Sequence, residues 1–150
     1  MKIVVDTNII FSAMLNPSAT IGQIIIYGQR QQQFEFFAPH LLKEEIKRHR
    51  NKIIEISKSI DEVTFEDIRD EVFRCVNFIS EEQIPYNFWY DAIPMVRDTD
   101  MDDIAFIVLA EYLDARLWTG DKKLLAGLEN YGYKRIITTE ELLTMKFYGQ

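Results

Sequence analysis

The sequence has 150 residues, of which 47% are hydrophobic and 27% charged, and its net charge is −7. These values predict one globular domain, residues 1–150, and the acidic balance argues against broad electrostatic binding of nucleic acid. One cysteine excludes an internal disulfide framework, two histidines are too few for a histidine-rich zinc site, and no stretch reaches the roughly 20 apolar residues of a membrane span.

Short apolar runs alternate with helical patterns along the chain. The runs predict strands at residues 2–5, 34–38, 115–119 and 135–138. The helical patterns predict a short helix from residue 21 that stops at Gly28, and a second one after Pro39 that reaches Ile53. A third helix is predicted over 64–78, starting on a capping box at Thr64, and two more over 101–113 and 122–128. The last predicted helix is capped by Thr139 and reaches Leu143. Residues 81–98 are expected to form a loop with a short helix, whose aromatic side chains favour packing over base stacking. The alternation predicts an α/β fold of three layers, with helices on both faces of a parallel sheet of about four to five strands.

The chain begins directly on a strand-like run, without a signal-peptide pattern, so we expect a cytoplasmic protein without a membrane anchor. Cys75 lies among apolar residues at helical spacing, which predicts a buried helical thiol and not a nucleophile. A basic run lies between residues 43 and 52 and has two interpretations. It is either a solvated helix face or a contact with a phosphate backbone made by Lys47, Arg48 and Arg50.

Acidic side chains follow two of the expected strands. Asp6 ends the first strand and Asp121 the third, and the carboxyl ends of parallel strands meet at one edge of a sheet. Asp103 opens a helix that can reach this edge, although acidic residues in a first helical turn are also a common dipole effect. Two carboxylates about 4 Å apart repel by roughly 4 kcal/mol at an effective dielectric of about 20, which a cation removes. Hard oxygen ligands suit Mg²⁺ or Mn²⁺ and not Zn²⁺, so the pattern predicts a divalent-metal site able to activate water for attack at phosphorus.

Other chemistries lack their motifs in this sequence. It contains no glycine-rich phosphate loop and no dinucleotide-binding glycine pattern, which argues against nucleotide cradling. It also lacks the G-x-S-x-G turn of serine hydrolases, and the one cysteine has no plausible His/Asn partner pattern.

Three blocks of the sequence carry a family resemblance. They are VVDTNII at 4–10, APHLLKEEI at 38–46 and DDIAFIVLAEYLDARLWTGDKKLL at 102–125. In this order and spacing they resemble the PIN domain, the metal-dependent nuclease fold of VapC-type toxins. D-T-N after a strand is a weak signal alone, and the specificity comes from the three blocks together.

The resemblance implies a role for each matching residue. Metal binding and catalysis would fall to four carboxylates: Asp6, Glu45, Asp103 and Asp121. Glu45 is preferred to Glu44 because the family places an aliphatic residue after its glutamate, and the two point about 100° apart on a helix. The tandem Asp102 and Asp103 leaves open which one enters the cleft. Supporting roles would fall to Asn8, which holds the Asp6 loop or a water, and to Thr119, which positions Asp121 or a water.

The implied activity is a metal-dependent endoribonuclease that hydrolyses single-stranded RNA, using Mg²⁺ or Mn²⁺. Such proteins are commonly homodimers and act as the toxin of a toxin–antitoxin pair, in which a small antitoxin protein plugs the acidic cleft. One alternative is a catalytically inactive PIN-fold scaffold or RNA-binding module. Another is an unrelated phosphatase with a nucleophilic aspartate, but such enzymes typically carry a second aspartate where this chain has Asn8.

Overall fold

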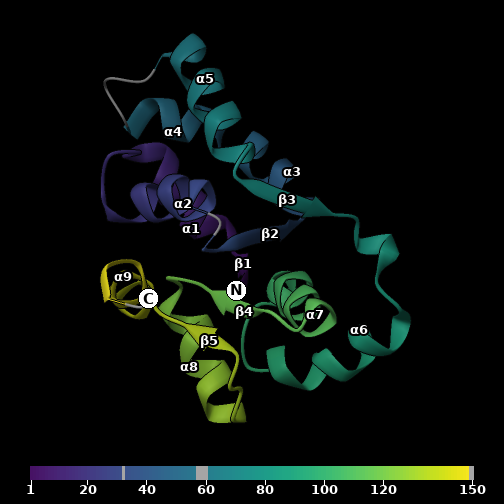
Figure 1. The fold of residues 1–150 in the computed structure, drawn as a ribbon. Helices are drawn as coiled ribbons and strands as arrows, with labels where there is room; N and C mark the ends of the chain where they lie inside the picture. The colour runs from purple at the N-terminus through teal and green to yellow at the C-terminus, as the bar shows by residue number, and fades with distance from the viewer. Residues whose placement is uncertain (32, 57–60, 149–150) are drawn as a thin grey trace.

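The computed structural model describes residues 1–31, 33–56 and 61–148, and its centre is a parallel sheet (Figure 1). The strands are β1 Lys2–Val5, β2 Glu35–Pro39, β3 Val76–Ile79, β4 Arg116–Trp118 and β5 Ile136–Ile137. Their spatial order is β3-β2-β1-β4-β5, with every neighbouring pair parallel. Because successive strands are added on one side of β1 up to β3 and on its other side from β4, the sheet has a switch point between β1 and β4, where ligands bind in such folds.

Helices cover both faces of this sheet, as the sequence predicted. The helices are α1 Thr7–Leu15, α2 Thr20–Arg30, α3 Leu41–Arg48, α4 Arg50–Ile56, α5 Glu62–Phe73, α6 Tyr86–Ala92, α7 Ile104–Leu113, α8 Lys122–Tyr131 and α9 Thr139–Tyr148, with short 3₁₀ turns η1 Glu81–Gln83, η2 Ile93–Val96 and η3 Met101–Asp103. In Figure 1, α1, α2 and α5 lie on one side of the sheet, and α6, α7 and α8 lie on the other. The expected three-layer α/β fold is therefore confirmed, with five strands.

The most buried helix is α7, which packs against β1, β2 and β4 on one side and α6 on the other. All side chains from Ala105 to Ala110 are buried, so the helix is apolar around its whole circumference. It ends on Asp114 in the left-handed conformation, with φ 51°. This rigid central helix starts directly after Asp103 and fixes where that residue lies.

The predicted helix over residues 64–78 is wrong in its last five residues, 74–78. Helix α5 ends at Phe73, and Val76–Ile79 forms the edge strand β3 beside β2. The apolar residues continue through this junction without a glycine or proline, so helical periodicity alone did not reveal the change. Cys75 is buried as predicted, but it lies between the helix and the strand and not within a helix.

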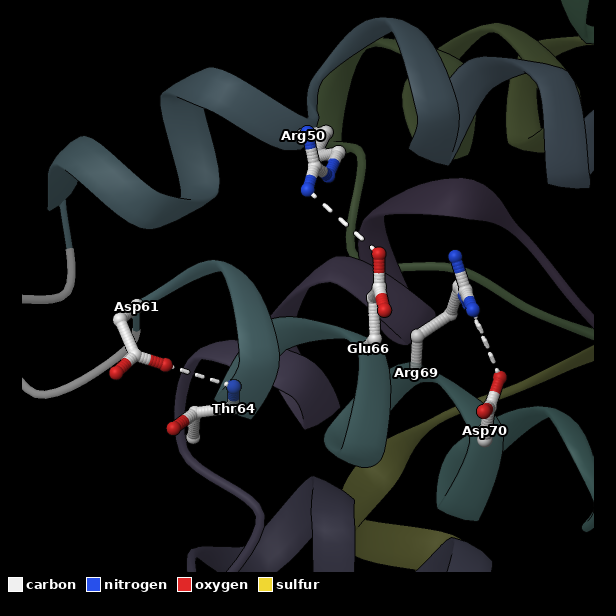
Figure 2. A network of polar contacts seen from close by, with 6 residues as sticks. All are labelled: Arg50, Asp61, Thr64, Glu66, Arg69 and Asp70. Atoms are coloured by element: carbon white, nitrogen blue, oxygen red, sulfur yellow. Dashed lines mark hydrogen bonds and ion pairs between the residues drawn. The ribbon is translucent and has the colours of Figure 1, made fainter.

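Two predicted helix caps are also wrong. Asp61 caps α5 by accepting a hydrogen bond of 2.8 Å from the backbone N–H of Thr64, so Thr64 lies inside the helix (Figure 2). At the last helix, the hydroxyl of Thr138 accepts from the backbone N–H of Glu141. The hydroxyl of Thr139 instead accepts from the indole N–H of Trp118.

Gly28 does not end its helix, because α2 continues to Arg30. A Cβ at this position would lie 2.7 Å from Cδ2 of Phe34, whose ring is buried. Glycine is therefore required here for close packing and not for a left-handed turn. The helix expected after Pro39 is divided at His49 into α3 and α4, and the helix expected to end at Leu143 reaches Tyr148.

In the described residues, no single helix is long and apolar enough to cross a membrane. Residues Thr7–Leu15 and Thr20–Gln29 together have the length and composition, but the chain bends by 103° between them.

Candidate functional site

A cleft of about 380 Å³ opens beyond the carboxyl end of β1. Its lining includes six carboxyl side chains: Asp6, Glu45, Asp100, Asp102, Asp103 and Asp121. The four carboxylates singled out in the sequence are among them, although they come from four separate segments of the chain. The fold thus brings them together as the strand-end argument required.

Asp6 lies where β1 passes into α1 and caps that helix. Its Oδ1 accepts a hydrogen bond of 3.0 Å from the backbone N–H of Ile9, and its Oδ2 accepts from the hydroxyl of Thr119. The residue is only 5% exposed. Burial raises the pKa of Asp6 to about 6, against the lowering effect of the hydrogen bonds from Thr119 and Ile9.

Thr119 connects Asp6 to Asp121. Its hydroxyl donates to Asp6 and accepts a hydrogen bond of 3.1 Å from the backbone N–H of Asp121. Asp121 in turn caps α8, because its Oδ1 accepts from the backbone N–H groups of Lys123 and Leu124. One buried hydroxyl therefore sets the relative positions of two strand ends.

Glu45 and Glu44 differ in their burial and in whether they line the cleft. Glu45 is half-buried on α3, lines the cleft, and accepts a hydrogen bond from the hydroxyl of Thr7. Glu44 is exposed and is not part of the lining. Asn8 also lines the cleft, with an exposed side chain in the first turn of α1.

The pKa of Asp103 reflects the negative charge gathered in the cleft. Its pKa is raised to about 7, first by burial and then by the charges of Asp121, Asp100, Asp6 and Glu45. Its neighbour Asp102 also lines the cleft, so both members of the tandem reach it, but Asp102 is exposed whereas Asp103 is half-buried.

The gathering of several carboxylates in one cleft lowers the stability of the folded chain unless a proton or a cation offsets their repulsion. An N-cap role can be filled by serine, threonine or asparagine as well as by aspartate, so capping alone does not explain a charge at both Asp6 and Asp121. Carboxyl groups whose pKa values are raised by burial and by mutual repulsion in a cleft are typical of functional sites.

The basic run divides between three environments. Arg48 lines the cleft, whereas Lys47 is exposed outside the lining. Arg50 points away to α5, where it forms an ion pair of 3.7 Å with Glu66 (Figure 2). Its guanidinium group also lies over the ring of Phe65. Only Arg48 of the three predicted RNA-binding residues therefore lies in the cleft.

Two further basic side chains of the run, His49 and Lys52, also line the cleft, although the RNA-binding prediction did not select them. His49 packs edge-on against Phe11, another lining residue, with 6.5 Å between ring centroids. Residues four apart share one helix face, but Lys43 and Lys47 have the same spacing as Arg48 and Lys52, so spacing alone could not select the pair in the cleft.

Across residues 1–31, 33–56 and 61–148, no three acidic, histidine or cysteine side chains stand close enough to hold one metal ion together. The carboxylates instead bind their own local donors, as Asp6, Glu45 and Asp121 do. The cleft gathers the donors without bringing them to coordination distance.

Comparisons with known proteins agree on the fold. The sequence profile of the PIN domain matches residues 4–147. The crystal structure of PAE2754 from Pyrobaculum aerophilum is similar over 100% of this chain and 91% of that chain, with a TM-score of 0.68 and 16% sequence identity. No curated protein matches the sequence. Because the profile covers nearly the whole chain, the protein belongs to the PIN domain family, whose members are generally metal-dependent nucleases.

Proposed function

We propose that the protein is a divalent-metal-dependent endoribonuclease whose catalytic residues are Asp6, Glu45, Asp103 and Asp121. The observation that carries the proposal is the meeting of these four carboxylates in one cleft, where the pKa of Asp103 is raised to about 7 by burial and by the other charges. Family membership supports hydrolysis of a phosphodiester bond.

The donor set fits Mg²⁺ or Mn²⁺ by its chemistry. All the candidate ligands are hard carboxylate oxygens, and neither Cys75 nor a cluster of histidines lies among them. Mg²⁺ usually keeps several waters and takes only one or two protein carboxylates, so it does not need three converging side chains. Asp6 and Asp121, joined through Thr119, are the pair we assign to direct contact, with Asp103 and Glu45 acting directly or through water.

When bound, a divalent cation supplies neutralising charge and activates the attacking water. The chain supplies the rest. Thr119 holds Asp6, and Thr7 holds Glu45, so the carboxylates keep fixed orientations. Asp103 is half-buried in the cleft beside the other carboxylates, so it is placed to orient the attacking water and accept its proton. Asn8 is placed to orient a water at the mouth of the cleft.

The test is cleavage of a mixed-sequence single-stranded RNA in Mg²⁺, Mn²⁺ or EDTA, comparing the wild type with Asp121→Asn. Asparagine caps helices as well as aspartate does, so the variant keeps the start of α8 while losing the charge. Metal-dependent cutting that the variant lacks supports the proposal. A folded wild type that cuts no RNA in any metal contradicts it and favours a scaffold role.

The narrower proposal is that the ribonuclease is the toxin of a toxin–antitoxin pair, with a small antitoxin as partner and a homodimer as its assembly. It rests on the resemblance of the three sequence blocks to VapC-type toxins. Induced expression of the wild type should arrest bacterial growth, and Asp121→Asn should not. Equal growth of both strains, with cleavage shown in vitro, would remove the toxin role and leave the nuclease.

A further inference from the structure

The cleft lining carries basic side chains from one segment and acidic side chains from another. Arg48, His49 and Lys52 come from α3–α4 and form what we call the basic wall, and Asp100 and Asp102 come from the start of η3 and form the η3 wall. The four candidate catalytic carboxylates line the same cleft. A polyanionic strand that enters this cleft is attracted to the first wall and repelled by the second.

The basic wall is set by the way α3 continues into α4. The backbone N–H of His49 donates to the carbonyl of Glu45 at 3.1 Å, and the N–H of Ile53 donates to the carbonyl of His49 at 3.0 Å. The helical hydrogen-bond pattern therefore runs on through the break. Arg48 and Lys52, four residues apart, stay about one turn from each other on the cleft side.

The two cations of the basic wall differ from their neighbours in their contacts with the part of the chain that the structure describes. Among the described residues, neither Arg48 nor Lys52 forms an ion pair, whereas Arg50 is held by Glu66 and Lys43 lies 4.3 Å above the ring of Phe78. An arginine offers a planar fork of donors that matches a phosphate, and a lysine offers a compact charge. The pair is thus available to a ligand in a cleft that otherwise carries excess negative charge.

Resting on the proposed nuclease function, we propose that Arg48 and Lys52 form a phosphate-binding rim that holds a backbone phosphate next to the one being cleaved. The strand then lies along α3–α4 and avoids the Asp100 and Asp102 wall. The site accordingly selects an oligonucleotide, in which a flanking phosphate exists, over a substrate with one phosphodiester.

The variant Arg48→Ala/Lys52→Ala tests the rim, and Lys43→Ala/Lys47→Ala is its matched control. Both remove two positive charges four residues apart from the same helical segment, but Lys43 and Lys47 are outside the cleft lining. Binding of a fluorescent single-stranded RNA 12-mer is measured by anisotropy in Ca²⁺ across a salt series. We expect the rim variant to bind roughly tenfold more weakly and its salt slope to fall by about 0.7, the value for one lost phosphate contact on a single strand. The control should bind nearly as the wild type does.

If the wild type and the rim variant bind RNA equally well, the proposed rim is wrong. It is also wrong if the control variant loses as much affinity as the rim variant, because binding would then depend on the general positive charge of the helices. This readout needs no cleavage, so the rim can stand even if the nuclease proposal fails. Where cleavage occurs, the rim variant should raise KM for RNA more than it lowers kcat. It should also lose more efficiency on RNA than on bis(p-nitrophenyl) phosphate. Equal losses on both substrates would contradict selection by a flanking phosphate.

Discussion

The hydroxyl of Thr119 donates a hydrogen bond to Oδ2 of Asp6 across 113 positions of sequence. The same oxygen accepts from the backbone N–H of Asp121, so one side chain joins the ends of β1 and β4. This hydrogen bond lowers the pKa of Asp6, whereas burial raises it. Thr119 therefore favours the charged form of a carboxylate that its surroundings would otherwise neutralise.

Thr119→Val should destabilise the protein and weaken the metal site. Valine keeps the shape but leaves a buried carboxylate oxygen without its donor, which costs about 1–3 kcal/mol. Urea unfolding at neutral pH measures the loss, and Thr119→Ser should recover most of it. If valine and serine behave alike, the hydroxyl does not hold Asp6.

Without metal, the protein should lose stability as the pH rises from about 4 to about 8. The folded-state pKa values of Asp6 and Asp103 are raised to about 6 and about 7 from 3.8, so the folded chain holds protons that the unfolded chain has released. Their contribution is full below the unfolded value and is lost as the pH passes the folded values. Thermal unfolding in EDTA measures it.

Asp103→Asn should flatten this pH dependence and raise the melting temperature at alkaline pH, since it removes the repelled charge. Asp98→Asn is the control, because Asp98 is exposed and does not line the cleft. A variant at Asp103 that keeps the wild-type slope would show that the charges do not interact.

Mg²⁺ or Mn²⁺ should stabilise the protein more at about pH 8 than at about pH 5, because the carboxylates must lose their protons to bind metal. At a concentration 100 times the dissociation constant the gain is about 2.7 kcal/mol. Asp6→Asn should largely abolish the shift in melting temperature while keeping the α1 cap. An unchanged shift would place the metal elsewhere.

Glu45→Gln should reduce RNA cleavage far more than Glu44→Gln. Glu45 faces the cleft and is held by Thr7, whereas Glu44 is exposed outside it. Initial rates at saturating Mg²⁺ compare the two isosteric changes. Equal losses, or the reverse order, would reassign the active face of α3.

Gly28→Ala should destabilise the fold although alanine favours helix. The new Cβ would meet the buried Phe34 ring at 2.7 Å, and such overpacking costs about 1–3 kcal/mol, against about 1 kcal/mol gained in helix propensity. Gly120→Ala has open space and should be tolerated. Urea midpoints compare the two, and a more stable Gly28→Ala would show that Phe34 moves aside easily.

The ends of β1 and β4 were predictable because the apolar run indicates the strand and the following carboxylate marks its carboxyl end. Asp6 and Asp121 could therefore be placed at one edge of the sheet from the sequence alone. The boundary between α5 and β3, from Phe73 to Val76, was not predictable, because its apolar residues fit both a helical and a strand pattern. A strand is therefore easier to recognise when a carboxylate or turn residue ends its apolar run than when an apolar helix leads directly into it, as at β3.

The basic wall shows another limit of the sequence. Six cations within ten residues gave no means of selecting those that face the cleft, because the rotation of α3 depends on packing against distant segments such as α1. The structure selects Arg48 and Lys52 and turns Arg50 toward α5. Helical spacing shows which basic residues share a face of the helix. Only the packing of the helix in the folded protein decides which face turns toward the cleft.

The central place of β1 in the sheet has a consequence for synthesis. Asp6 and Glu45 precede Asp103 and Asp121 in the sequence, and the later pair reaches the cleft only when β4 pairs with β1. During synthesis, the first two carboxylates are therefore made before the segment that brings the other two to them. The four-carboxylate cleft cannot form until the chain has been made through Asp121.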